Sequence, residues 1–387
     1  MVRLRDVCEN VATEDPTKHN KTIDYIDISA IDAEAKEIVD YKTVLSAEAP
    51  SRARQKVYTG DVLVSTVRPN LNAVATIKAH ENDIIASTGF CVLRAKRELA
   101  LSRYIFEFTK TPKFVSALVS QATGASYPAV SNKIVLNERI PLPPLPTQQK
   151  IADILDRASA LIEQRKTQIA KLELLVKSQF VEMFGDCEAT RKRLKEICDF
   201  IDYRGKTPEK SETGIPLITA KNVKENAFSV EPQEFIPEAN YETVMTRGIP
   251  QHNDVLFTTE APLGNVCRIP PIYEKFCVGQ RLITMQPKAD ILTSEYLERA
   301  LLTQDFQEQV LRRSTGSTVM GIRSKELVEL TVPIPSLDLQ TRFADFAERV
   351  ETQKARMREG LGLMETNYKA LMQRCFEGEI SSPSQLR

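Results

Sequence analysis

Two stripes of apolar residues with helical spacing are the strongest hydrophobic pattern in the chain. In both stripes apolar residues recur mostly at steps of three, four or seven positions, and Arg165 is the one charged residue on the first stripe. The first stripe consists of Ile151, Ile154, Leu155, Ala158, Leu161, Ile162, Ile169, Leu172, Leu175, Val176, Phe180, Met183 and Phe184. The second consists of Phe343, Phe346, Val350, Met357, Leu361, Met364, Leu371, Cys375 and Phe376. Near-heptad spacing over about five heptads predicts two long helices with a coiled-coil type of seam.

Prolines mark the start of the first long helix. Residues 141–146 contain four prolines, which cannot continue a helix, so we predict that Thr147 is the N-cap. A helix of about 38 residues is roughly 57 Å long. That is longer than a domain built from one half of this chain can cover. We therefore expect the two helices to pair antiparallel, the alternative being that each packs on its own half. Gly360 and Gly362 each cost up to about 1 kcal/mol inside a helix and predict a break, a bend or a close contact.

The remaining sequence alternates strand-like runs with turns and shorter helices. Residues 22–28, 60–66 and 283–285 are rich in β-branched residues and are bounded by turn residues, as is typical of strands. Helices are predicted over residues 102–109 and 294–311. This mixture favours an α+β fold over a doubly wound parallel sheet.

The two halves of the 387-residue chain repeat each other at an offset of about 190 residues. Four pairs of segments match in the same order, namely 3–9 with 193–199, 61–66 with 254–259, 123–126 with 315–318, and 140–143 with 332–335. A period this long indicates a duplicated domain, since solenoid repeats run roughly 20–50 residues. We predict two mixed α/β domains, residues 1–146 and 191–337, each followed by a helical segment, residues 147–190 and 338–387. The expected architecture has a pseudo-twofold internal repeat.

Composition narrows the possible functions. The chain has 52 basic and 52 acidic residues, and residues 1–146 (19 basic, 17 acidic) and 191–337 (19 and 20) are each nearly neutral. Neutral halves argue against tight autonomous binding to nucleic acid, which relies on phosphate neutralisation. No apolar run approaches the roughly 20 residues that span a bilayer, and the N-terminus lacks a signal peptide, so we expect no membrane contact and a cytoplasmic location. Seven scattered cysteines and three distant histidines predict reduced thiols and no metal site.

Sequence motifs for catalysis are missing. The chain has no phosphate-binding Gly-x4-Gly-Lys loop, no dinucleotide-binding glycine motif, no nucleophile elbow and no Asn/Asp-Pro-Pro-aromatic motif of amino-methyltransferases. Polar loops instead recur at equivalent places, around residues 68–72 and 261–265, 87–90 and 278–281, and 123–127 and 312–318. Their arginine, asparagine and glutamine side chains can pair with base edges, and their hydroxyl groups can hold phosphates. Taken alone, any one of these loops is more simply explained as an ordinary turn.

Taken together, these features resemble the specificity subunit of Type I restriction-modification systems, over essentially the whole chain. Residues 140–151, with their prolines, Gln148 and Ile151, resemble the entry to a helix of that family, and Phe184-Gly185-Asp186 resembles its end. Arg204-Gly205-Lys206-Thr207-Pro208 is similar to the start of many of its target recognition domains. The second copy is looser, because Asp338-Leu339-Gln340 has lost some prolines.

The resemblance implies two target recognition domains, each reading half of a bipartite double-stranded DNA site, with antiparallel coiled-coil helices as a ruler between them. It implies a subunit with no enzymatic activity or cofactor of its own. Its expected partners are two modification subunits, which carry S-adenosylmethionine and methylate adenine N6, and restriction/translocase subunits. The residues that we expect to contact DNA are Arg52, Arg54, Arg68, Asn70, Asn72, Ser126, Tyr127, Arg204, Lys206, Thr207, Asn265, Gln280, Arg281, Arg313 and Ser317.

Two other interpretations remain open. The chain could be a duplicated coiled-coil adaptor whose loops bind proteins, and steep salt dependence of binding would then be missing. It could also be the recognition subunit of a related enzyme that cleaves on both sides of its site, which only the partner's domains would reveal.

Overall fold

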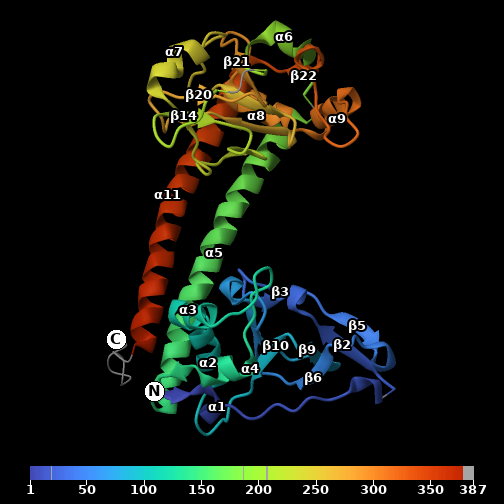
Figure 1. Cartoon of the computed structure of the whole chain (residues 1–387). Coiled ribbons are helices and arrows are strands. Elements are labelled where there is room, and N and C mark those ends of the chain that lie inside the picture. Colours follow the sequence, from blue (N-terminus) through green and yellow to red (C-terminus); the bar gives the residue numbers. More distant parts are fainter. Residues whose placement is uncertain (19, 186, 206–207, 378–387) are drawn as a thin grey trace. The chain divides into compact units, whose positions relative to one another are not determined.

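The computed structural model describes residues 1–18, 20–185, 187–205 and 208–377 (Figure 1). Its contacts divide the chain into two compact units. Unit 1 comprises residues 1–166 and 359–387, and unit 2 comprises residues 167–358. Two 40-residue helices, α5 (Leu145–Phe184) and α11 (Leu337–Phe376), contribute to both units, so each unit contains one end of each helix.

Unit 1 is built from short strands and helices. Its strands are β1 (Val2–Arg3), β2 (Thr22–Ile26), β3 (Ile31–Asp32), β4 (Glu37–Ile38), β5 (Lys42–Leu45), β6 (Ala53–Val57), β7 (Val62–Ser65), β8 (Val74–Thr76), β9 (Asp83–Ser87), β10 (Phe90–Leu93) and β11 (Arg139–Ile140). Its shorter helices are α1 (Leu4–Val7), α2 (Ser102–Thr109), α3 (Pro112–Ser120) and α4 (Asn132–Asn137). The larger sheets have the strand orders β5-β2-β9-β6 and β10-β7-β8.

Unit 2 has a similar mixture. Its strands are β12 (Thr190–Arg193), β13 (Cys198–Asp202), β14 (Ile215–Ile218), β15 (Val223–Lys224), β16 (Ala227–Phe228), β17 (Phe235–Ile236), β18 (Val255–Thr259), β19 (Leu263–Arg268), β20 (Cys277–Val278), β21 (Leu282–Pro287) and β22 (Thr331–Ile334). Its shorter helices are α6 (Leu194–Ile197), α7 (Tyr241–Val244), α8 (Ser294–Leu301), α9 (Gln304–Arg313) and α10 (Ser324–Leu327). The larger sheets have the orders β13-β21-β18-β19 and β17-β14-β20.

The strand pairings of the two units show the internal repeat, because equivalent residues pair in the same way in each unit. Val62 pairs with Leu93 on one side and Thr76 on the other, all antiparallel. In unit 2 Val255 pairs with Met285 and Arg268 in the same way. The partners are displaced by 192 or 193 residues along the chain. Strands β7, β8 and β10 of unit 1 therefore correspond to β18, β19 and β21 of unit 2.

A glutamine near the start of each long helix, Gln148 in α5 and Gln340 in α11, joins that helix to its unit through hydrogen bonds of its side-chain amide. The Gln148 side chain is buried, accepts a hydrogen bond from the Leu101 N–H (3.0 Å), and donates to the carbonyls of Leu99 (2.9 Å) and Pro143 (2.8 Å). Gln340 is also buried and bonds residues 291, 293 and 335 of unit 2 in the same pattern. A buried amide that satisfies three main-chain groups has few substitutes, which explains why this residue recurs in the two copies.

The aspartate of the second repeated motif also has a structural role. Asp61 accepts a hydrogen bond from the Tyr58 N–H (2.9 Å) and a two-point ion pair from Arg94 (3.0 and 2.7 Å). Asp254 bonds residues 251 and 286 in the equivalent places. Burial raises the pKa of Asp254, outweighing its hydrogen bonds with residues 251 and 286, which act in the opposite direction.

Each hydrophobic core takes in the ends of both long helices. In unit 1, residues 151 and 155 of α5 and residues 372, 375 and 376 of α11 are buried with the core of α1–α4 and β7, β8 and β10. Figure 1 shows this end of α5 beside α2 and α3. In unit 2, residues 176, 180 and 184 of α5 join residues 343, 347 and 350 of α11. The rings of Phe180, Phe184, Tyr296 and Phe343 lie with centroids 4.8–5.6 Å apart in this core.

Several local predictions are confirmed and others are wrong. The helix over residues 102–109 and the strands at 22–26, 62–65 and 282–287 are present. Thr147 is not the N-cap, because α5 begins at Leu145 and Pro146 lies in its first turn, where a helix requires no N–H donor. The predicted helix 294–311 is two helices, α8 and α9, since Thr303 caps a new helix by accepting from the Phe306 N–H.

The glycines of α11 do not interrupt the helix, which is continuous from Leu337 to Phe376. A Cβ placed on Gly360 would lie 3.0 Å from Nη1 of Arg165, so within unit 1 this glycine is a close contact with the one charged residue of the first stripe. At Gly362 a Cβ would meet nothing within 4 Å.

Three further observations concern the described part of the chain. It holds no helix that is both long and apolar enough to cross a membrane. It also contains no cluster of histidine, cysteine, aspartate and glutamate side chains with the arrangement of a metal site. All seven cysteines are free thiols, and six of them are buried.

Candidate functional site

The repeated Thr-Gly segments form closed loops in both units. In unit 1, Thr123 and Ala129 exchange two main-chain hydrogen bonds of 3.0 and 2.9 Å, and residues 315 and 321 do the same in unit 2. Gly124 has a φ of +105°, and a Cβ there would lie 3.0 Å from the carbonyl oxygen of residue 127. Gly316 has a φ of +130°, and its Cβ would lie only 2.0 Å from the Val319 oxygen. The loops therefore close only because glycine occupies their second position.

Two further segments meet each closed loop. The strand end at Val67 forms a bridge with Ala129, as residue 260 does with residue 321. The next residues, Arg68 and Ala261, have left-handed backbones, with φ of +50° and +43°. Such conformations are uncommon for residues other than glycine and occur frequently at functional sites.

A turn provides the third segment. The Gly89 carbonyl accepts hydrogen bonds from the Thr66 N–H (2.9 Å) and Oγ1 (2.8 Å). In unit 2 the Arg281 carbonyl accepts the same two bonds from Thr259, at 3.0 and 3.3 Å. We refer to residues 66–72, 87–90 and 123–129 as cluster 1. We refer to residue 204 with residues 259–262, 279–281 and 315–323 as cluster 2. The two clusters have one main-chain framework.

Cluster 1 exposes a stacked arginine and tyrosine. The Arg68 guanidinium lies 4.6 Å from the centre of the Tyr127 ring, and Tyr127 is 68% exposed. An exposed stack of this type contributes about 0.5–1 kcal/mol and holds the arginine in one orientation. Asn70 and Ser126 are also exposed in this cluster. Four of the predicted residues thus come together on the surface of unit 1.

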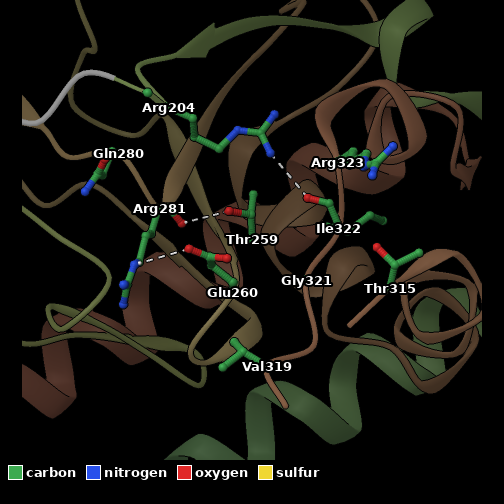
Figure 2. Close-up of a pocket in the computed structure, with 11 residues that line it drawn as sticks. Arg204, Thr259, Glu260, Gln280, Arg281, Thr315, Val319, Gly321, Ile322 and Arg323 are labelled. Carbon is green, nitrogen blue, oxygen red and sulfur yellow. Dashed lines mark hydrogen bonds and ion pairs between the residues drawn. The ribbon is translucent and has the colours of Figure 1, made fainter. Parts of the chain in front are cut away.

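Cluster 2 surrounds a cavity of about 360 Å³ (Figure 2). Arg204, Gln280, Arg281 and Arg323 line it from three separate segments, since residues 280 and 281 are adjacent in the chain. The Arg281 Nε lies 3.3 Å from Oε1 of Glu260, and both side chains are about half exposed. Three of the lining residues, at positions 204, 280 and 281, were predicted as ligand contacts, and Ser317 is exposed in the adjoining closed loop.

Arg204 is held by the protein itself. Its Nε and Nη2 contact the two carboxylate oxygens of Asp202 at 3.0 and 2.8 Å, and its Nη1 donates to the Ile322 carbonyl at 3.3 Å. Ser324 contacts both Arg204 and Asp202. Burial acts to raise the pKa of Asp202, but these hydrogen bonds and the arginine charge outweigh it, and the pKa is lowered. The guanidinium is therefore fixed at the edge of the cavity.

Other predicted residues have internal partners. Arg54 pairs with Asp15 (2.6 Å), and Arg313 with Glu326 (3.5 Å). The Asn265 amide donates to the carbonyl of residue 223 (3.0 Å). The Asn72 carbonyl accepts a bond from the ammonium of residue 36 (2.6 Å). These contacts stabilise unit 1 or unit 2 whether or not a ligand binds.

The last three predicted residues need separate mention. Arg52 is exposed, and its carbonyl accepts a 2.9 Å bond from the Thr88 N–H of cluster 1. Lys206 and Thr207 lie outside the described residues. Prediction from the sequence missed Glu260 and Arg323 of cluster 2. The available signal was their place after the repeated segments, Glu260 directly after 254–259 and Arg323 five residues beyond 315–318.

The equivalent positions of the two clusters carry different side chains. Glu260 of unit 2 corresponds to Val67, and Arg281 corresponds to Gly89. Exposed arginine, amide and hydroxyl groups on one framework, with different side chains in each copy, are typical of modules that read nucleic acid. Fold and site therefore define the class: a protein with two similar modules whose loops share one framework and expose different side chains.

Comparison with known proteins identifies the family. The family model of the Type I restriction modification DNA specificity domain matches residues 1–174 and 188–360. The chain belongs to this family and carries two copies of the domain. The Type I restriction enzyme MjaVIII specificity subunit of Methanocaldococcus jannaschii is 24% identical to it over 318 residues, covering 76% of this chain and 74% of that subunit.

Solved structures support the assignment. A chain from work described as "Structural basis underlying complex assembly and conformational transition of the type I R-M system" has a TM-score of 0.65 and 28% identity, covering 98% of this chain and 97% of that chain. The Type I restriction-modification S subunit from M. genitalium, with a TM-score of 0.54, 16% identity and coverage of 97% and 99%, shows the likeness of fold alone.

Proposed function

We propose that this chain is the non-catalytic recognition subunit of a Type I restriction-modification complex. Unit 1 would read one half of a bipartite double-stranded DNA site through cluster 1, and unit 2 the other half through cluster 2. The single observation that carries this proposal is the repeated three-segment framework with different exposed side chains. A shared framework supports the same mode of binding, and different side chains support different base sequences.

The long helices would separate the two half-sites. Residues 147–190 and 338–387 would pair as an antiparallel coiled coil, and residues 1–146 and 191–337 would be the target recognition domains. Contacts between α5 and α11 within unit 2 support pairing, because Lys354 of α11 bonds Glu173 of α5. A paired helix of fixed length sets the distance between the half-sites because it resists bending and stretching.

Partner subunits would supply the chemistry and part of the affinity. Two modification subunits would carry S-adenosylmethionine and methylate adenine N6 within the site, and restriction/translocase subunits would join them in the cytoplasm. Exposed apolar side chains on the long helices, such as Leu161, Leu174, Val181 and Leu363, support such docking, since each is more than half exposed. The equal numbers of basic and acidic residues support a need for partners that neutralise phosphates.

Sequencing of modified bases tests this proposal directly. DNA would be compared from cells with and without this gene, with the neighbouring genes intact. Loss of N6-methyladenine at one bipartite motif is the expected result, and it would give both half-sites and the spacer. An unchanged methylation pattern, with the protein shown to be present in the complex, would contradict the proposal and favour a protein-binding adaptor.

A further inference from the structure

The ion pair between Glu260 and Arg281 is the feature of cluster 2 that has no counterpart in cluster 1. We propose that this pair reads one G·C base pair in the half-site of unit 2, with Arg281 on guanine and Glu260 on cytosine. The proposal rests on the proposed function, because it names the base pair that one recognition module would select.

The framework of cluster 2 does not need either side chain. Arg281 serves the framework through its carbonyl oxygen, which accepts the two bonds from Thr259. Residue 260 serves it through the main-chain bridge to Gly321. In unit 1 the same roles are filled by Val67 and Gly89, neither of which can form an ion pair through a side chain. The Glu260 and Arg281 side chains are therefore additional to the structure of the loop.

Stability gives no sufficient reason for the pair. The side chains of Glu260 and Arg281 are 45% and 52% exposed, and ion pairs that face water contribute little to folding. A carboxylate on a surface that approaches DNA is also unfavourable beside phosphates, which carry the same charge. It becomes favourable where it accepts a hydrogen bond from a base, and cytosine N4 is the usual donor to a carboxylate in the major groove.

The geometry of the pair agrees with this partner. Arg281 faces Glu260 through Nε, at 3.3 Å, and the structure shows no hydrogen bond from its side chain to another described residue. Figure 2 shows the end of the guanidinium directed away from the carboxylate. The N–H donors at the end of the Arg281 guanidinium and the acceptor oxygens of the Glu260 carboxylate therefore lie next to each other in one row. Arg204, neutralised by Asp202, lines the same cavity, and Arg323 adds a positive charge to its lining.

One base pair presents the complementary row. In the major groove G·C offers two neighbouring acceptors, guanine N7 and O6, followed by the cytosine N4 donor. Arginine satisfies both acceptors at once, and the adjacent carboxylate accepts from N4. An A·T pair alternates acceptor, donor and acceptor, so the arginine would face a donor with its second N–H group. The pair thus favours G·C by contact and disfavours A·T by repulsion.

Methylation motifs in cells test the assignment. Wild type and the variants R281K, R281A and E260Q would each be expressed in cells that lack this gene but keep the partner genes, and N6-methyladenine would be mapped by sequencing. R281K is the decisive variant, because lysine preserves a phosphate contact but loses the two-point contact with guanine. R193A and E329Q are matched controls, since Arg193 and Glu329 form another ion pair within reach of solvent in unit 2, at 3.2 Å, with side chains 52% and 33% exposed.

The expected result is relaxation at a single position. R281K, R281A and E260Q should all accept other bases at the same position, which is G·C in the wild-type motif, with discrimination falling about 10- to 100-fold. The other half-site should stay unchanged, and both controls should keep the wild-type motif. An unchanged motif in R281K, uniform loss of methylation in R281K, or relaxation at an A·T position would each overturn the assignment. Failure of wild type to restore methylation at any bipartite motif would instead overturn the proposed function itself.

Discussion

Glu173 of α5 forms hydrogen bonds with α8, α11 and the turn at residue 226, all within unit 2. Substituting it measures how much these bonds contribute to the stability of unit 2. Its Oε1 accepts hydrogen bonds from Nη1 of Arg299 on α8 (2.8 Å) and from the Asn226 amide, and its Oε2 accepts one from the Lys354 ammonium of α11. The side chains of Lys354 and Arg299 are only 4% and 12% exposed, while Glu173 is 36% exposed. Two buried cations therefore share one carboxylate that is partly exposed to solvent.

The variant E173Q keeps the size of the side chain and removes its charge. Lys354 would keep only the carboxylate of Glu351, at 2.6 Å, and Arg299 would lose its ion pair. Removing one partner of a buried ion pair costs about 3–5 kcal/mol. Because water reaches part of Glu173 and Glu351 remains, we expect a loss of about 2–3 kcal/mol in the free energy of opening of unit 2.

Hydrogen exchange on the purified chain separates the two units in one experiment. Amides of residues 167–358 should exchange faster in E173Q, by the factor that corresponds to this loss, and amides of residues 1–166 should serve as an internal reference. The double variant E173Q/K354M removes the buried ammonium as well and should recover a large part of the stability. Unchanged exchange in unit 2 of E173Q, or a double variant less stable than E173Q, would refute the reasoning.

The dependence on pH follows from the same contacts. Burial acts to raise the pKa of Glu173, but the Lys354 hydrogen bond and the Arg299 charge outweigh it, so the pKa is lowered from its ordinary value of 4.5. A carboxyl group with a lowered pKa in the folded state stabilises that state fully above its ordinary pKa. The advantage of wild type over E173Q should therefore be constant at neutral pH and shrink as the pH falls below about 4.5.

Two more predictions concern the closed loops and the helices. Gly316→Ala should distort closed loop 315–321, because the new Cβ would lie 2.0 Å from a main-chain oxygen, and methylation at the motif should fall at least about tenfold. Gly362→Ala, whose Cβ meets nothing within 4 Å, is the matched control and should leave the motif intact. Inserting one helical turn in both α5 and α11 adds about 5.4 Å and should lengthen the spacer by one or two base pairs without changing the half-sites. A spacer of unchanged length would contradict the proposal that the paired helices set the distance between the half-sites.

Much of the fold was predictable, because the chain repeats itself. Helices α5 and α11 followed from the two apolar stripes, and each helix ends at the last residue of its stripe. The break in the helix predicted at 294–311 was missed, since the cap at Thr303 is a local choice that the wider apolar pattern conceals. Gly360 could be marked from the sequence as unusual, but its contact with Arg165 required the two helices to be placed side by side.

The candidate site was only partly predictable. Repetition identified the loops around residues 123–126 and 315–318, and the structure brings Arg68 to Tyr127 and Arg281 to the cavity of cluster 2. Residue type alone could not show that Arg54 and Asn265 bond other parts of the protein. Glu260 was missed because a lone glutamate in a polar turn is ordinary until an arginine 21 residues later is placed beside it.

The sequence by itself determined the duplication, the two long helices, the absence of catalytic motifs and the family that the chain resembles. These properties depend on the order and spacing of residue types, which the chain carries without being folded. Tertiary structure alone decided that each core takes in ends of both helices, that Gln148 and Gln340 bond main-chain groups about 47 residues away, and that Glu260 faces Arg281. Such contacts join distant segments, and their partners are selected by the packing of the whole unit, so no local pattern in the sequence encodes them.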